Sequence, residues 1–296
     1  MTQAMRAFAA WVTRRPFRLV LLTILFVQLL MPIAGALLVL DALRRGTMAA
    51  ALSAAIATAA VLGIGLALGA GAINTLSVTA PVLLLGVASG GLLVWSRSLS
   101  LGFQGTVVGV MLGALVVFAL FADPMAIGTF LRREFLLILE SGGVEAAQLE
   151  QFEAITPIEL TRVVLIALLG SALLALLLGY WCYSLIVDGI HFGSDFRALR
   201  LGRVAGIVLM VAVTAYLLVG GDWLASIAPL AVIGFLFQGL AVLHARSHAG
   251  NWHRAVIVLV YLLFVSPLAQ WVFMGVSAVG LLDNFFNLRT PPERRV

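Results

Sequence analysis

The sequence contains eight runs of mostly apolar residues, each close to the roughly 20 residues that a helix needs to cross the core of a bilayer. The runs are Leu19–Leu40, Met48–Ala70, Ser77–Trp95, Leu101–Ala122, Leu160–Val187, Val204–Gly220, Trp223–Leu243 and Ala255–Leu282. None alternates apolar and polar residues with period two, so transmembrane β-strands are a poor alternative. We therefore predict an all-α fold, a polytopic transmembrane helical bundle, in which residues 1–296 form a single integral membrane domain.

The composition excludes several classes of protein and of site. Apolar residues make up 62% of the chain and charged residues 10%, whereas a soluble domain is about half apolar and about a quarter charged. All 18 basic residues are arginine, so a Walker A loop and a Schiff-base lysine are absent, and ATP-driven transport would need a separate ATPase. Cys182 is the only cysteine, which excludes a disulfide within the chain and a cysteine-based metal site.

The sequence carries no recognisable motif for enzymatic chemistry. Every Asp, Glu and Arg lies at or near the end of an apolar run, which argues against a proton pump or a channel with buried charges. Acidic and basic groups are paired near one membrane face only at Asp188, His191 and Asp195, the one cluster that a membrane enzyme could use. We expect no enzyme, no catalytic residue, no cofactor, no metal and no nucleic-acid partner.

The distribution of arginines predicts which side of the membrane each connection faces. The short connections near 71–76 and 221–222 carry no basic residue. The connections that alternate with them are basic, with Arg44, Arg45, Arg97, Arg197, Arg200, Arg203, Arg246 and Arg254. The positive-inside rule places these arginines in the cytoplasm and the connections near 71–76 and 221–222 outside. Since a chain rich in Arg, Ala, Gly and Leu is typical of a GC-rich bacterial genome, we expect the bacterial inner membrane.

The first and last apolar runs each contain a proline that bears on this topology. Arginines stand both before and after the first run, so a single crossing cannot place both groups in the cytoplasm. A break at Pro32 resolves the conflict with two short helices, about 18–31 and 33–43, that form a hairpin or re-entrant pair. We favour this hairpin over one span with a proline kink. Pro267 leaves the same choice open for the last run, and with it the side of the C-terminus.

The long connection 123–159 separates the fourth and fifth runs. It is acidic, with seven Asp and Glu residues against Arg132 and Arg133. Apolar residues recur there at helical spacing, at Ile127, Phe130, Leu131, Phe135 and Ile138. We predict an external amphipathic insertion whose helix lies on the membrane surface.

Small residues recur every four positions on three of the runs, so each series lies along one helix face. The longest series, here called the α-ladder, comprises Ala51, Ala55, Ala59, Gly63, Ala67 and Gly71. Shorter series are Gly86 and Gly90, and Gly105, Gly109 and Gly113. Small residues let helices approach closely in lipid. We favour tight packing within the chain, and the alternative is that one series docks another membrane protein.

Uncharged polar residues cluster at one predicted external connection. They are Asn74, Thr75, Ser77 and Thr79, and Trp223 begins the run after the other external connection. Such groups could orient a small ligand in a membrane cavity. They could equally cap helix ends, which is the interpretation that we favour.

Two stretches of the C-terminal half resemble the YybS-like family of bacterial membrane proteins. The first comprises Leu178–Tyr183 and Asp195–Leu201, where the family has an aromatic pair and then an acidic-aromatic-x-x-Leu-Arg-Leu run. The second is Gly280–Arg289, with the Gly, Asp, aromatics and Arg that close the family. The matching positions have no known role: Asp195, Arg197, Arg200, Gly280, Asp283 and Arg289. The chain departs from the family pattern at Gly179, Asn287 and Leu288.

The family is distantly similar to the substrate-binding components of energy-coupling-factor vitamin transporters, which have no ATPase of their own. The resemblance implies a transport component that binds a small solute near residues 74–79 and Trp223 and docks a membrane subunit through the α-ladder. The alternative is a non-catalytic membrane scaffold or assembly factor that acts through its small-residue helix faces and the arginines of 197–203. The expected partners are the lipid bilayer, other membrane subunits and a small-molecule solute.

Overall fold

The computed structural model describes residues 2–69, 71–121, 125–145, 152, 154–250 and 253–289. Within these ranges every regular element is a helix and no strand occurs, which confirms the predicted all-α fold. The helices are α1 (Thr2–Thr13), α2 (Pro16–Leu29), α3 (Met31–Arg45), α4 (Thr47–Ala67), α5 (Ala72–Ser96), α6 (Leu99–Phe121), α7 (Met125–Ser141), α9 (Pro157–Ile186), α10 (Phe192–Arg197), α11 (Gly202–Val219), α12 (Asp222–His248), α13 (Arg254–Leu263) and α14 (Ala269–Phe286).

Six helices of the described chain are long and apolar enough to cross a membrane, namely α4, α5, α6, α9, α11 and α12. They correspond to the second through the seventh apolar run of the sequence. Their outward surfaces are apolar, as on α11, where Leu218 and Val219 are each 81% exposed. A surface of this kind is stable in contact with lipid chains and not with water. The chain is therefore a multi-pass membrane protein.

The first apolar run is broken into two helices, as predicted. α2 ends at Leu29 and α3 begins at Met31, and Leu30 between them leaves the helical conformation, with φ −146° and ψ 77°. Pro32 lies in the first turn of α3, where the missing N–H of proline has no helical partner to lose. At 14 and 15 residues the helices span only about 21 and 22 Å, less than a bilayer core. That both ends of the pair face the cytoplasm stays a prediction.

The last apolar run, which the sequence left undecided, is also broken. α13 ends at Leu263 and α14 begins at Ala269, and Pro267 lies in the connection between them. Proline cannot donate the backbone hydrogen bond that would continue α13. The first and the last apolar run, which contain Pro32 and Pro267, are thus each divided into two short helices. The unpaired backbone groups at the breaks need neighbouring helices to shield them from lipid.

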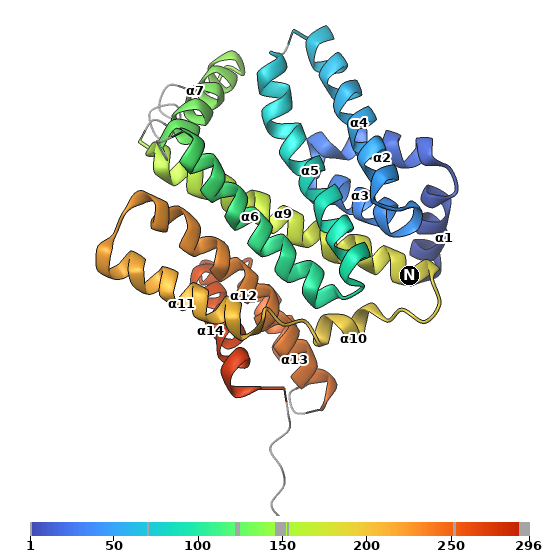
Figure 1. Ribbon diagram of the computed structural model, residues 1–296, viewed down its shortest axis with the longest axis vertical. Helices are drawn as coiled ribbons and strands as arrows, with labels where there is room; N and C mark the ends of the chain where they lie inside the picture. Colours follow the sequence, from blue (N-terminus) through green and yellow to red (C-terminus); the bar gives the residue numbers. More distant parts are fainter. Residues whose placement is uncertain are drawn as a thin grey trace, which may run out of the picture.

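The long helix α9 lies between two groups of helices (Figure 1). It contacts α1, α3 and α5 of one group and α12 of the other. One buried apolar cluster joins α9 to α6 and α12, around Phe103, Leu173 and Phe235. A second cluster gathers α2, α3, α4 and α5, around Leu19, Leu38 and Leu83. The first cluster also contains Val39 of α3 and Leu93 of α5, so the packing around α9 joins the two groups of helices.

The centre of the first group is α3, whose residues from Ala34 to Ala42 are all buried. Glycines on the neighbouring helices make this burial possible. A Cβ atom added to Gly86 of α5 would lie 3.0 Å from the Cα of Gly35, and one added to Gly179 of α9 would lie 2.6 Å from the Cβ of Val39. The basic residue that the family resemblance implies at Gly179 would not fit, so the departure at this position follows from the packing of α9 on α3.

In the second group, α12 and α14 touch backbone to backbone. A Cβ atom on Gly280 would lie 2.0 Å from the carbonyl oxygen of Phe235, and one on Gly239 would lie 1.9 Å from that of Val276. No side chain can occupy either position without moving a helix. The role of the family-motif residue Gly280 in the structure is thus to let α14 lie against α12.

We expect the Gly280→Ala variant to unfold more readily than the parent protein. The added methyl group forces α14 away from α12, and overpacking of this kind costs about 1–3 kcal/mol. Gly275→Ala on the same helix is the matched control, because nothing lies within 4 Å of its added Cβ. It should gain up to about 1 kcal/mol of helix propensity. Thermal unfolding in detergent measures both, and equal midpoints for the two variants would contradict the assigned packing.

A helix forms within the acidic connection, as its apolar spacing predicts. α7 covers Met125–Ser141 and packs against the start of α9. The contact is close at Gly128, where an added Cβ would lie 1.8 Å from the carbonyl oxygen of Pro157. Residues 123, 124, 146–151 and 153 of the predicted insertion lie outside the described residues. The external, surface-bound position of the insertion stays a prediction.

Candidate functional site

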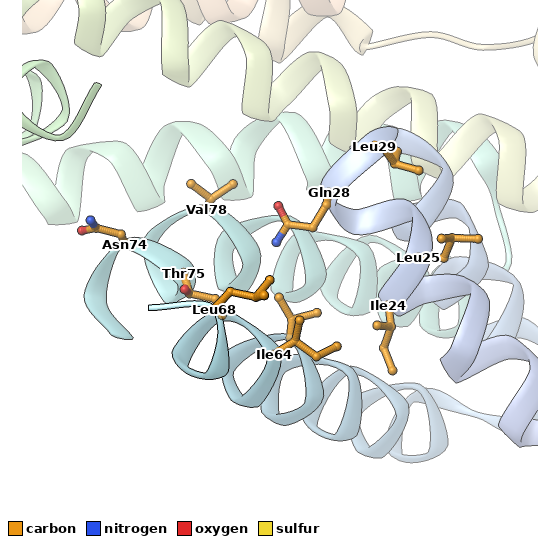
Figure 2. Close-up of a pocket in the computed structure, with 11 residues that line it drawn as sticks. Ile24, Leu25, Gln28, Leu29, Ile64, Leu68, Asn74, Thr75 and Val78 are labelled. Carbon is orange, nitrogen blue, oxygen red and sulfur yellow. The ribbon is translucent and has the colours of Figure 1, made fainter. Parts of the chain in front are cut away.

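A cavity of about 650 Å³ lies between α2, α4 and α5 (Figure 2). Small-molecule sites have volumes of about 300–1,000 Å³, so the space suffices for a small solute. The residues that line it are Ile24, Leu25, Gln28, Leu29, Val61, Ile64, Gly65, Leu68, Asn74, Thr75 and Val78. All but three of them are apolar or glycine. The polar groups are the side chains of Gln28, Asn74 and Thr75.

Local backbone features place these polar groups around one space. The break at Leu30 ends α2 just after Gln28, so that this amide extends from the last turn of the helix. The connection from α4 to α5 turns at Gly69, whose φ of +81° favours glycine. It returns the chain so that Thr75 packs on α4, where a Cβ on Gly65 would lie 2.7 Å from the Thr75 hydroxyl oxygen. The glycine at position 65 therefore makes room for the threonine.

The polar groups of the cavity have hydrogen-bonding capacity to spare. The Thr75 hydroxyl donates to the carbonyl oxygen of Gly71 over 3.1 Å and keeps its acceptor sites. Within the described chain the amides of Gln28 and Asn74 make no hydrogen bond. Figure 2 shows the Gln28 amide directed from α2 into the space beside Leu68, and the Asn74 amide directed away from α2. Gln28 is thus the amide best placed to contact a solute.

Of the predicted ligand-binding residues, Asn74 and Thr75 line the cavity, whereas Ser77 and Thr79 do not. The Ser77 hydroxyl donates to the carbonyl oxygen of Asn74 over 3.0 Å, and Thr79 is buried with its hydroxyl oxygen unpaired in the described structure. The side chain of Trp223 lies outside the described residues. A role in binding stays a prediction for all five.

The favoured capping interpretation of this cluster is wrong. The N-cap of α5 is Gly71, and no side chain bonds to the cap of this helix. The hydroxyls of Thr75 and Ser77 bond instead to carbonyls of the preceding turn. Sequence reasoning did not assign Gln28 to the site, because the proximity of α2 to α4 and α5 depends on the break at Leu30.

A second polar site unites the two stretches that resemble the YybS-like family. The carboxylate of Asp283 on α14 is 1% exposed and accepts hydrogen bonds from Arg289 and from Gln238 of α12. Arg289 also donates to the carbonyl oxygens of Arg197 and Leu199. Arg289 therefore ties the end of α14 to the loop that follows α10.

The other motif positions lie in or near this polar site. Arg200 lies 3.8 Å from the Asp283 carboxylate and donates to the side chain of Asn287. The Gln238 side chain accepts from the backbone N–H of Leu201. Asp195 lies apart from Asp283 and accepts from the hydroxyl of Tyr180 over 2.7 Å. Burial lowers the pKa of Arg289 below its ordinary value, and the adjacent Asp283 carboxylate opposes this shift.

We expect Arg289→Gln to destabilise the protein by about 3–5 kcal/mol, because it leaves Asp283 buried without its main counter-charge. Arg200→Gln should cost about 1 kcal/mol or less, since the Arg200 side chain is 43% exposed and farther away. Adding Asp283→Asn to Arg289→Gln should recover part of the loss. Denaturant unfolding in detergent measures the free energies of unfolding for this double-mutant cycle. Strictly additive changes would show that Asp283 and Arg289 do not interact.

The small-residue series fall on different kinds of surface. Gly86 and Gly90 are buried against α3, as favoured, and Gly105 packs on Leu92 of α5. The favoured interpretation, packing within the chain, is wrong for the α-ladder. Its residues Ala55, Ala59, Gly63, Ala67 and Gly71 are exposed, and only Ala51 is half-buried. Gly109 and Gly113 are exposed too, with nothing within 4 Å of an added Cβ. The inward face of α4 carries instead Ala50, Ser53, Ala54, Ala57 and Val61.

A third polar site at the end of α3 was not predicted. Asp41 is 1% exposed, and Arg45 donates to both of its carboxylate oxygens, over 2.5 and 2.6 Å. Ser53 of α4 donates to the same carboxylate over 2.8 Å and accepts from Arg45 over 2.9 Å. The four-residue spacing of Asp41 and Arg45 is a signal in the sequence. The part played by Ser53 depends on how α4 packs.

The acidic residues considered for a membrane enzyme are not gathered into one site. Asp188 is fully exposed and lies 3.7 Å from Arg6, whereas Asp195 is bonded to Tyr180. Among the described residues no three His, Cys, Asp or Glu side chains are grouped so that they could hold a metal ion. The absence of enzymatic activity, of a cofactor and of a nucleic-acid partner stays a prediction.

Comparisons with protein-family models, with curated proteins and with solved structures find no match to this chain. The resemblance to the YybS-like family therefore rests on the quoted stretches alone. Arg197, Arg200, Asp283 and Arg289 of these stretches lie together in one polar site, whereas Asp195 and Tyr180 lie apart from it. The functional argument rests on the cavity and the polar sites themselves.

Proposed function

We propose that this protein is the substrate-binding component of a membrane transport system and that the cavity between α2, α4 and α5 holds the solute. The observation that carries the proposal is the unbonded amide of Gln28, which points into a largely apolar cavity of about 650 Å³ that the Thr75 hydroxyl also lines. An apolar space with a few polar groups that converge on it is the usual form of a small-molecule site. The proposed location is the bacterial inner membrane.

The energy for transport would come from another subunit. The chain has no lysine and hence no Walker A loop, and no charged side chain lines the cavity. The α-ladder lies on α4, the helix that also contributes Ile64 and Leu68 to the cavity. A subunit that docks on this small-residue face would contact the same helix as the solute and so could act on the site.

We expect native mass spectra of the protein, released from mild detergent, to show one small-molecule adduct per chain. The double variant Gln28→Leu, Thr75→Val should lose the adduct or retain it at least about tenfold more weakly, because two hydrogen-bonding groups at about 1 kcal/mol each are removed. Thr58→Val is the matched control, since the Thr58 hydroxyl also bonds within its own helix, to Ala54, and lies outside the cavity.

Two results would contradict the proposal. The first is a parent protein that carries no adduct and also binds nothing in a screen of solutes. The second is an adduct that the double variant keeps as well as the Thr58→Val control does, since the solute would then lie elsewhere.

The exposed small-residue faces favour a second candidate, a non-catalytic membrane scaffold or assembly factor. Faces of this kind, at Gly63 on α4 and Gly109 on α6, offer close approach to another helix without disturbing the fold. In this case the cavity would be empty, and the protein would be isolated with bound subunits.

We expect Gly63→Leu to leave the fold intact and to release any subunit bound on the α-ladder. Nothing lies within 4 Å of an added Cβ at Gly63, so the cost of the change falls on the complex and not on the chain. Gly275→Leu, at an equally open position on α14, is the control. Co-purification from membranes measures both variants, and a complex that survives Gly63→Leu would argue against this face.

A further inference from the structure

A second cavity, of about 570 Å³, continues the first along α2 and α4. α2 lines it with Pro16, Phe17, Val20, Leu21 and Ile24, and α4 lines it with Ala49, Leu52, Ser53 and Ile56, beside Arg45. Ile24 lines both cavities. From the second cavity to the first, the numbers of the lining residues increase along both α2 and α4. The two cavities therefore form one groove between these helices. From Ala49 to Leu68 the groove is about 28 Å long, close to the thickness of a bilayer core.

The groove opens sideways, toward the space that lipid chains occupy. Leu21 on α2 is 62% exposed, and Leu52 and Ile64 on α4 are 63% and 52% exposed. Apolar side chains line it along its length, and polar groups stand only near its ends. A hydrocarbon chain could enter from the bilayer and lie along the groove. A hydrophilic solute would lose its hydrogen bonds to water there, because the side chains along the groove are apolar.

The two ends of the groove differ in charge. One end has the neutral groups of Gln28, Asn74 and Thr75. The other has Arg45, whose side chain is 32% exposed and whose Nε and Nη2 are held by the buried Asp41 and by Ser53. Its remaining Nη1 makes no hydrogen bond within the described chain. Asp41 thus fixes the guanidinium in place and leaves one edge free for an anion.

Further positive charge surrounds this end. Arg15 directly precedes Pro16, a lining residue, and Arg44 directly precedes Arg45, and both are exposed. Three arginines thus stand against the single carboxylate of Asp41. The local excess of positive charge favours an anionic group, and the neutral far end gives no such preference.

We propose that the groove between α2 and α4 binds a single-chain anionic amphiphile, with its carboxylate at Arg45 and its hydrocarbon chain running toward Gln28. This inference goes beyond the proposed function, because a hydrocarbon chain makes no hydrogen bond to Gln28 or Thr75 and its binding does not depend on them. One chain is expected because the groove is a single channel between two helices. The carboxylate would accept from the free Arg45 edge, and the chain would contact Leu21, Ile24 and Ile56.

The test uses the full chain in nanodiscs of uncharged phosphatidylcholine, with isotopically labelled palmitate and cetyl alcohol as probes. Palmitate should bind saturably at one molecule per chain, and cetyl alcohol at least tenfold more weakly. Leu52→Trp, which fills the groove from an exposed position and keeps the Asp41–Arg45 pair, should weaken palmitate binding at least tenfold. Arg203→Gln, at an exposed arginine outside the groove, is the control and should change nothing.

Charge is tested by the double variant Asp41→Asn, Arg45→Gln, because Arg45→Gln alone would leave a buried carboxylate unpaired and could unfold the chain. It should reduce palmitate binding to the level of cetyl alcohol. Equal binding of the two probes, or palmitate binding that rises without saturation and ignores Leu52→Trp, would overturn the inference. A native adduct with the mass of a diacyl phospholipid would also overturn it.

The same data separate this inference from the proposed function. An adduct that the Gln28→Leu, Thr75→Val variant loses supports the transport component alone, and saturable palmitate binding that Leu52→Trp weakens supports the amphiphile alone. Failure of both the native adduct and the palmitate titration overturns both.

Discussion

The structure depends on burying short helices among long ones. A bilayer offers no water to hydrogen bond with exposed backbone groups, so a helix that is too short to cross must be covered by its neighbours where its backbone groups are unpaired. α3 meets this condition at the centre of the first group of helices, where Ala34–Ala42 are buried. α14 meets it by lying against α12 at Gly280. In both cases glycine allows the contact, and the long helices form the surroundings that make a proline break tolerable.

Polar side chains also hold the short helices against the long ones. Near the C-terminal end of each of these two short helices is an aspartate that is 1% exposed, Asp41 on α3 and Asp283 on α14. Each is bonded to an arginine that follows it within six residues. Each of these ion pairs also recruits a polar side chain from a long helix, Ser53 of α4 or Gln238 of α12. The charges that mark the edges of the apolar runs are therefore used to attach the ends of short helices.

The sequence was sufficient to predict the long helices and a break near Pro32, because hydrophobic length is a local property and the arginines on both sides of the first run are incompatible with a single crossing. It could not decide the break at Pro267, since a proline within an apolar run kinks a helix in one context and ends it in another. It also could not tell which face of α4 is covered. Small residues suit inward packing and outward docking equally, and the structure leaves Gly63 open while it buries Gly86.

The candidate site could be predicted only in part from the sequence. Asn74 and Thr75 stood out as polar residues in an apolar chain, and the structure places both at a cavity. Gln28 joins them only because α2 ends next to α5, which is a tertiary fact. The polar site around Asp283 was visible as two motif stretches about 80 residues apart in the chain, and only folding shows that Arg289 joins them.

The position of Arg289 has a consequence for the order in which the protein matures. A ribosome releases this residue only after all the long helices have been made. Until then the carbonyl oxygens of Arg197 and Leu199 and the amide of Gln238 lack the partners that the end of α14 supplies. The second group of helices can therefore enter the membrane during synthesis but reaches its final arrangement only after α14 and Arg289 have been made.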